Sequence, residues 1–337
     1  MRFRFSAIAV SALLAGAAFG QTERVLHFTH TDSPQGFREV SNIIRTMAEI
    51  RDVSVDETAR TLTLHATAGQ IAVSEWLFRE LDQNSGVQPT PPNSPMHEYR
   101  MPGSTQAVRV YYLAHTATPQ GMQEIVNAAR SITDMRNLFP CSGPRALALR
   151  GTEDQMAMAE WVLNELDQPP PPPAEKPLVH EFHPAGGGDD MVARVFFMAH
   201  TRTPQGIQEI VNLIRTMADV QRFYPVNQTM AVVMRGSVAQ GALAEWLFNE
   251  LDRPAGTHSA ATPHEYQFPG RPDGLVRVFY VANAGTPQAL QEINNQVRIA
   301  AQIQRAFPYR SLSALVMRGT AAQIGVAERL INEHDSR

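Results

Sequence analysis

Histidines at the ends of three similar apolar segments are the first residues that could do chemistry. His30, His115 and His200 each close such a segment, and Asn283 takes the same position near the C-terminus. Histidine binds metal ions and transfers protons, but the sequence places no set of further ligands around any of the three. We therefore expect each of them to hydrogen-bond the next turn, not to bind a metal.

Two further features could be an ion-binding or a reactive site. The Gly-Gly-Gly-Asp-Asp run at 186–190 lacks the alternating oxygen ligands of a calcium loop and is typical of a hairpin tip. Cys141 is the one cysteine, which excludes internal disulfides. We expect it in a turn or strand, with a reactive thiol or an intermolecular disulfide as the alternative. No Ser/His/Asp set or carboxylate pair stands out, so we expect no enzyme, no metal and no cofactor.

A fourfold internal repeat determines the elements that position these residues. The tripeptide Thr/Ser-Pro-Gln begins at Ser33, Thr118, Thr203 and Thr286, with steps of 85, 85 and 83 residues. Each copy ends in a similar segment that begins with Glu and closes with Asp, at 75–82, 160–167, 245–252 and 328–335; Trp follows the Glu in the first three copies and Arg329 in the fourth. A fixed period of this kind predicts tandem modules of one fold.

The third copy shows the predicted fold most clearly. Residues 194–200 alternate like a strand, and Thr203 with Pro204 begins an amphipathic helix. Residues 222–224 and 230–235 read as a β-hairpin, and a second helix follows at 238–251. The prediction is α+β: four tandem β-α-β-β-α two-layer sandwiches. Short segments at 97–99, 180–182 and 264–266 predict an added edge strand in copies two to four.

The predicted domain boundaries follow from the repeat and from proline-rich stretches. Residues 1–20 are typical of a secretory signal peptide, with Arg2 and Arg4 before an apolar run too short to span a membrane. The modules are then 21–83, 97–168, 180–253 and 264–337, joined by linkers 84–96, 169–179 and 254–263. Proline-rich linkers are stiff and extended, which predicts beads on semi-rigid spacers.

Charge and loop composition argue against a nucleic-acid partner. The net charge is −4, and Lys176 is the only lysine after the leader, so no basic patch is expected. RNA-binding KH domains share the β-α-β-β-α order, but they need a Gly-x-x-Gly loop after the first helix. That loop is missing from all four copies.

Four polar positions on the first predicted helix are identical in every copy and fall away from its apolar side. Surface polarity kept after a recent duplication explains this stripe, and so does a repeated contact between modules or subunits; a sugar-binding surface is a further reading. The positions are Gln35, Glu39, Asn42 and Arg45; Gln120, Glu124, Asn127 and Arg130; Gln205, Glu209, Asn212 and Arg215; and Gln288, Glu292, Asn295 and Arg298.

Tryptophans mark the second predicted helix. Trp76, Trp161 and Trp246 project away from its apolar centre, and the fourth copy has Arg329 there. Such a residue either packs at the core edge under a linker or anchors an interface. A polar replacement in the terminal copy is what capping of an array produces.

The first copy resembles the short periplasmic N-terminal domains of secretins, the outer-membrane channels of type II and III secretion and type IV pili. The resemblance rests on the hairpin at 53–64, which begins Val53-Ser54-Val55-Asp56, and on the helix ending Glu80-Leu81-Asp82. The resemblance implies modules that pack side by side with those of neighbouring subunits, as in the rings of that family. Copies two to four have Phe139-Pro140, Tyr224-Pro225 and Phe307-Pro308 instead of the Val-x-Asp start, and no pore-forming region is expected.

Together these observations predict an exported, periplasmic scaffold that binds protein partners or itself. The resemblance implies a place at the outer membrane beside a secretion or pilus channel. The alternative is a cell-envelope carbohydrate- or peptidoglycan-binding protein that uses the three tryptophans with neighbouring Gln and Asn side chains. Neither prediction involves nucleic acid or a membrane span.

Overall fold

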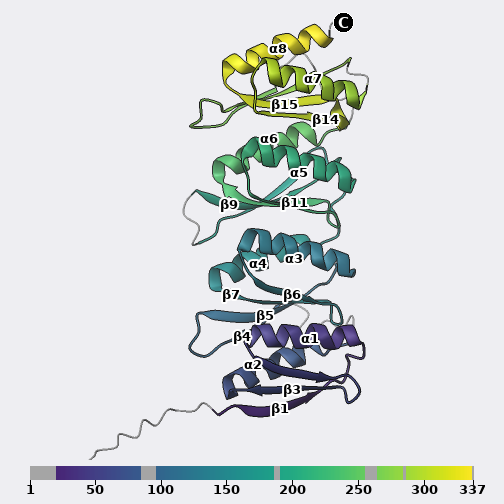
Figure 1. Cartoon of the computed structure of the whole chain (residues 1–337), viewed down its shortest axis with the longest axis vertical. Helices are drawn as coiled ribbons and strands as arrows, with labels where there is room; N and C mark the ends of the chain where they lie inside the picture. The colour runs from purple at the N-terminus through teal and green to yellow at the C-terminus, as the bar shows by residue number, and fades with distance from the viewer. Residues whose placement is uncertain (1–19, 85–95, 186–189, 255–263, 284–285, 336–337) are drawn as a thin grey trace, which may run out of the picture.

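The chain forms a column of four stacked modules, each a small sheet with two helices on one face (Figure 1). The computed structural model describes residues 20–84, 96–185, 190–254, 264–283 and 286–335. The predicted signal peptide, the Gly-rich run at 186–189 and most of two predicted linkers lie outside these ranges. The four antiparallel sheets with their helices confirm the α+β class.

Module 1 follows the order β-α-β-β-α. It consists of β1 (Thr22–His27), α1 (Pro34–Met47), β2 (Asp52–Asp56), β3 (Thr61–Ala66) and α2 (Ala68–Leu81). Ser33 caps α1 by accepting a hydrogen bond from the Gly36 N–H at 3.0 Å, and Pro34 holds the first helical position. The Thr/Ser-Pro-Gln repeat is therefore a helix start.

Modules 2 to 4 add an edge strand in front. Module 2 has β4 (Met96–Arg100), β5 (Gln106–Tyr112), α3 (Pro119–Thr133), β6 (Asn137–Cys141), β7 (Ala146–Thr152) and α4 (Glu153–Leu166). Module 3 has β8 (Leu178–Phe182), β9 (Met191–Phe197), α5 (Pro204–Ala218), β10 (Arg222–Val226), β11 (Ala231–Ser237) and α6 (Val238–Leu251). Module 4 has β12 (His264–Gln267), β13 (Leu275–Tyr280), α7 (Pro287–Ala300), β14 (Arg305–Tyr309), β15 (Ala314–Gly319) and α8 (Ala321–Asp335).

All four sheets share one antiparallel pattern. Module 1 has the order β1-β3-β2, and modules 2 to 4 have orders such as β4-β5-β7-β6, with the added strand at one edge. In module 2, Val110 pairs with Ala148 and Phe139 pairs with the same Ala148 from the other side. This register places equivalent residues of the four modules on equivalent faces of their sheets.

The aspartate that closes each repeat holds the loop between the first strand and the first helix. Asp82 accepts hydrogen bonds from the N–H groups of Thr29, His30 and Thr31 at 2.7, 3.1 and 2.7 Å. Burial raises the pKa of Asp82, but the hydrogen bonds from Thr29 and Thr31 outweigh it and leave this pKa lowered. Asp167, Asp252 and Asp335 accept equivalent bonds.

The modules share hydrophobic cores, so the picture of beads on stiff spacers is wrong. One core contains Ile43 and Leu77 from the helices of module 1 together with Val110, Tyr112 and Ala148 from the sheet of module 2. The next two junctions repeat this arrangement. The helix layers of modules 1 to 3 are thus each enclosed between their own sheet and the following one (Figure 1).

Strand composition explains why the modules stack. The third strand of module 1 alternates, with Thr61 and Thr63 half-exposed and Leu62 buried. The equivalent strand of module 2 is buried on both faces, with Ala146 and Ala148 in place of the threonines. Strands that read as continuous apolar runs are covered on both sides. The preceding helices provide that cover.

Candidate functional site

The chain has three junctions, where the helices of one module face the sheet of the next. We number them by the modules they join: junction 1/2, junction 2/3 and junction 3/4. Most of the residues singled out by the repeat lie at these junctions or line grooves beside them. Their contacts show what each position does.

The invariant glutamate of the first helix binds the hairpin turn of the following module. Glu39 accepts hydrogen bonds from the N–H and hydroxyl of Ser142 at 2.7 and 3.0 Å. Glu124 accepts them from the N–H of Asn227 at 2.9 Å and from its side-chain amide at 3.2 Å. Glu209 accepts one from the Arg310 N–H at 3.1 Å. The carboxylate therefore sets the register of each junction.

The asparagine, arginine and glutamine positions of the polar stripe make different contacts from the glutamate. Asn127 crosses junction 2/3 and donates to the Tyr224 hydroxyl at 3.1 Å. The arginine instead acts within its own module: Arg45 donates to the Val53 carbonyl at 2.8 Å, and Arg130 and Arg215 make the same bond to their own strands. The glutamine is exposed in all four modules. The stripe is thus not one uniform contact surface.

The tryptophans anchor the junctions within the chain. Trp76 packs against Tyr99 of the next module with ring centroids 5.6 Å apart. Trp161 stacks on Phe182 at 5.4 Å, and Trp246 lies 5.6 Å from Tyr266. Each aromatic partner comes from the added edge strand. In module 4 the equivalent residue is Arg329 on α8, which has no aromatic partner of this kind among the described residues.

A histidine–glutamate pair accompanies each tryptophan, and the sequence analysis did not identify it. His97 Nδ1 lies 2.8 Å from Glu80 Oε2, and the pairs His180–Glu165 and His264–Glu250 repeat the contact at 2.6 and 2.8 Å. The Tyr112 hydroxyl also donates to Glu80, at 2.6 Å. Burial raises the pKa of Tyr112, and the bond to Glu80 raises it further. The sequence signal that could have identified this pair is the His-Glu-aromatic tripeptide, which occurs in modules 2 to 4.

An arginine on the last strand of modules 2 to 4 is a second junction residue that sequence reasoning missed. Arg150 Nη1 donates to the Met47 carbonyl at 2.8 Å, at the C-terminal end of α1. Arg235 and Arg318 bind the Ile132 and Met217 carbonyls at 2.9 and 2.6 Å. A cation at a helix C-terminus is favourable, since the last carbonyls lack helical partners. Module 1 has no predecessor, and the equivalent residue is His65.

The two ends of the column lack these features. The outer sheet face of module 1 carries half-exposed Thr61, Thr63 and His65. At the other end, α7 places exposed Gln296 where the junction helices have buried Ile43, Ala128 and Leu213. Stacking of a further identical module on either end would bury polar side chains. Both terminal faces are therefore capped.

The histidines and the cysteine that were considered for chemistry make contacts that hold the fold together, as His30 and Cys141 show. His30 Nδ1 lies 2.9 Å from the Asp82 carbonyl, so it contacts the end of α2 and not the next turn as expected. Cys141 ends β6 and is buried against module 1, and burial raises the pKa of its thiol. Across the described ranges, no cluster of three His, Cys, Asp or Glu side chains is arranged to hold a metal ion. No helix in the same ranges is long and apolar enough to cross a membrane.

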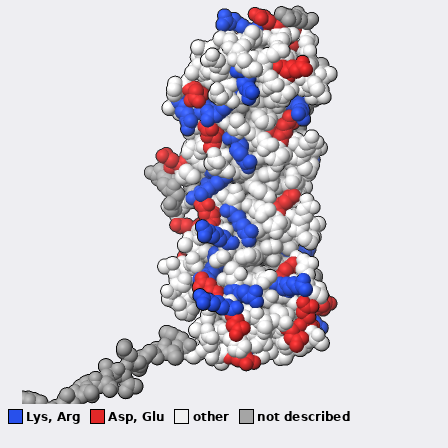
Figure 2. Space-filling model, in the orientation of Figure 1, with Lys and Arg blue, Asp and Glu red and all other residues white. Residues whose placement is uncertain are grey.

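The charged side chains are balanced along the column. Figure 2 shows basic side chains close to acidic ones on the face in view. Within modules 2 and 3 the arginine of the second strand bridges two glutamates, as in Arg194 with Glu181 and Glu245. Paired charges of this kind form no continuous basic surface.

Comparisons with known proteins give partial similarities. No protein-family model and no curated protein sequence matches the chain. Among solved structures it is similar to Dim2p from Pyrococcus horikoshii OT3, with 10% identity, a TM-score of 0.24, and coverage of 44% of this chain and 92% of that one.

The chain is also similar to two secretin structures. One is the pilotin–secretin AspS–GspD complex of ETEC, and the other is ExeD of Aeromonas hydrophila; both have 12% identity and a TM-score of 0.17 and cover 69% of this chain. The chain spans 38% and 41% of their lengths. TM-scores of this size do not establish a shared overall fold.

Proposed function

We propose that this protein is an exported, non-enzymatic scaffold that acts as a stiff rod of four modules and holds protein partners at defined positions in the cell envelope. The observation that supports this proposal most directly is that the hydrophobic cores extend across all three junctions. A chain of independent beads would leave these sheet faces polar, as on module 1. The apolar sheet faces of modules 2 to 4 are covered only when the modules stack into a rod.

Several contacts oppose bending at each junction. At junction 1/2 these are the Glu39–turn bonds, the Arg150–Met47 bond and the Trp76–Tyr99 contact. Hydrogen bonds to charged groups contribute about 1.5–3 kcal/mol each. Opening a junction would break all of these together and expose apolar surface, so the rod behaves as one body.

The expected location and partners follow from the sequence. The signal-peptide pattern supports export, and the secretin resemblance favours a component of a secretion or pilus channel as partner. With both ends capped, partners bind along the sides of the rod. This differs from ring assembly through the helix stripe, because the stripe glutamates of modules 1 to 3 are already bound to the following module.

Small-angle X-ray scattering of the mature protein tests the rod. We expect one elongated particle with a fixed maximum dimension and the cross-section of a single module. A broad distribution of dimensions would show independent modules and would refute the proposal. Mass spectrometry of the secreted form tests export, with Gln21 expected as the N-terminal residue; an uncleaved cytoplasmic product would contradict it. Co-purification with an outer-membrane channel from cross-linked envelopes tests the partner.

A further inference from the structure

Open grooves lie at equivalent places beside junctions 1/2 and 3/4, next to the start of the first helix. They measure about 680 Å³ at junction 1/2 and about 690 Å³ at junction 3/4, within the range of ligand sites. Both are lined by the invariant glutamine and glutamate of the first helix and by the hairpin of the next module. At junction 2/3 the side chain of Gln228 occupies this place, lying against Gly121 and donating to Thr116 Oγ1 at 3.0 Å.

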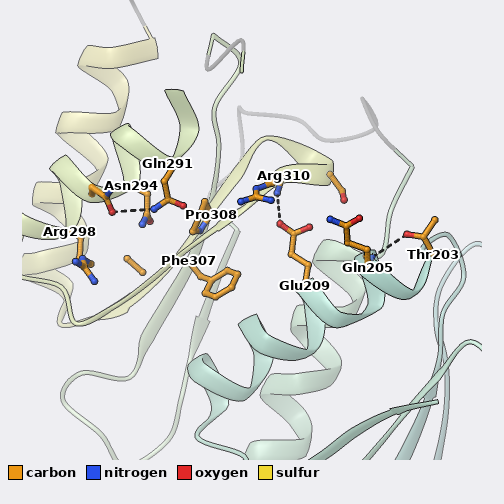
Figure 3. A pocket seen from close by; sticks show the side chains of 13 residues that line it. Thr203, Gln205, Glu209, Gln291, Asn294, Arg298, Phe307, Pro308 and Arg310 are labelled. Carbon is orange, nitrogen blue, oxygen red and sulfur yellow. Dashed lines mark hydrogen bonds between the residues drawn. The ribbon is translucent and has the colours of Figure 1, made fainter. Parts of the chain in front are cut away.

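The groove at junction 3/4 is rich in amides. Gln205 enters it from α5, and Gln291, Asn294 and Asn295 enter it from α7, with the hairpin residue Phe307 between the two helices (Figure 3). Amide side chains donate and accept hydrogen bonds at once, as hydroxyl groups do. This composition matches a ligand with many hydroxyls.

Packing within the fold does not explain why residue 294 is an asparagine. Its side chain is 3% exposed, and its Oδ1 has no hydrogen-bond partner among the described residues. Modules 2 and 3 have Val126 and Val211 at this position. Leaving a buried amide oxygen unpaired is unfavourable, so packing alone favours valine. Rotation about the soft χ2 torsion of Asn294 would turn its amide toward a ligand in the groove.

Arg298 also differs from its equivalents. The guanidinium groups of Arg45, Arg130 and Arg215 each donate to a carbonyl of their own module. The Arg298 side chain is exposed, and its guanidinium has no hydrogen bond or ion pair with any residue the structure describes. Its side chain lines the groove instead (Figure 3). An unpaired guanidinium is suited to a bidentate bond with a carboxylate.

We propose that the groove at junction 3/4 binds a carboxylate-bearing saccharide. The amides of Gln205, Gln291 and Asn294 bind hydroxyl groups, Arg298 binds the carboxylate, and the ring of Phe307 packs against the apolar face of the sugar. An extended peptide is disfavoured here. Strand β14 is the sheet edge beside the groove, but Pro308 within it has no N–H to pair with an added strand.

Binding is measured on the full mature chain by saturation-transfer NMR and calorimetry. The probes are oligogalacturonate, which carries carboxylates, and a neutral chito-oligosaccharide of equal length. We expect oligogalacturonate to bind at least tenfold more tightly than the neutral probe. Arg298→Gln should remove that preference, because it removes the carboxylate partner and keeps the side-chain amide.

Two variants separate a ligand role from a structural one. Asn294→Val, the residue found in modules 2 and 3, should lower affinity about tenfold while thermal stability stays equal or rises. Gln35→Ala, the matched change in the other groove, should leave the affinity unchanged. The proposal is overturned if neither probe binds at millimolar concentration, if both bind equally, if Arg298→Gln and Asn294→Val change nothing, or if an acidic peptide binds more tightly than oligogalacturonate.

Discussion

Replacing Glu124 by alanine is the sharpest test of how the junctions are held. This carboxylate is half-buried and accepts bonds from the Asn227 N–H, the Asn227 side chain and the Gln228 N–H, at 2.9, 3.2 and 3.3 Å. Two of these donors are backbone N–H groups of the turn between β10 and β11. Bonds to a charged acceptor contribute about 1.5–3 kcal/mol, and unpaired donors add a desolvation cost.

We expect Glu124→Ala to lower the free energy of unfolding by about 2–3 kcal/mol. Glu124→Gln keeps one acceptor oxygen without the charge and should cost about half as much. The matched control is Glu292→Ala, the same position of the same repeat on the free face of α7, where no module follows. Surface changes of that kind stay within about 0.5 kcal/mol.

Urea unfolding monitored by tryptophan fluorescence measures these differences, because Trp161 lies in the affected junction. Amide hydrogen exchange gives a local readout: the Asn227 N–H should exchange about 30-fold faster in Glu124→Ala, since 1.4 kcal/mol corresponds to tenfold. Equal effects of Glu124→Ala and Glu292→Ala would refute the view that the invariant glutamate acts across the junction.

Three further predictions follow from the same contacts. Trp161→Ala should cost about 2 kcal/mol through the lost stacking on Phe182, measured by urea unfolding; a change below 0.5 kcal/mol would contradict an anchoring role. Arg235→Met should cost about 2 kcal/mol, because it leaves the Ile132 carbonyl uncapped, and a neutral result would exclude that cap. The lowered pKa of Asp82 stabilises the fold above the unfolded value of about 3.8, so stability should fall as pH drops through the folded pKa; Asp82→Asn should flatten this dependence in acid titrations followed by circular dichroism.

Local structure was predictable from the sequence because its signals are local. The helix predicted at 238–251 is α6 (Val238–Leu251), and each Thr/Ser-Pro-Gln tripeptide caps the helix that follows it. N-capping and amphipathic spacing act over a few residues, so one repeat unit contains all the information they need. The α+β class of the modules followed from these elements.

A repeated contact between modules was one reading of the polar stripe, but hydrophobic cores shared between modules were not predicted, although the strands carried their signal. Thr61-Leu62-Thr63-Leu64 alternates, whereas Ala146-Leu147-Ala148-Leu149 is apolar throughout. That difference identifies which sheets are covered on both faces. The departures at Phe139-Pro140 and its counterparts have the same origin, because Phe139 packs on the helices of module 1 where Ser54 of that module faces outward.

By itself, the sequence determined a fourfold repeat, where the first helix of each copy starts, and which helix face meets its own sheet. Only the tertiary structure decided where the polar stripe points. A polar face that hydrogen-bonds another module has the same composition as one that faces water. Glu39 and Ser142, 103 residues apart, meet only because successive modules stack. The fold thereby distinguished glutamates that join modules from arginines that stay within one, and left a groove in which one arginine remains unpaired.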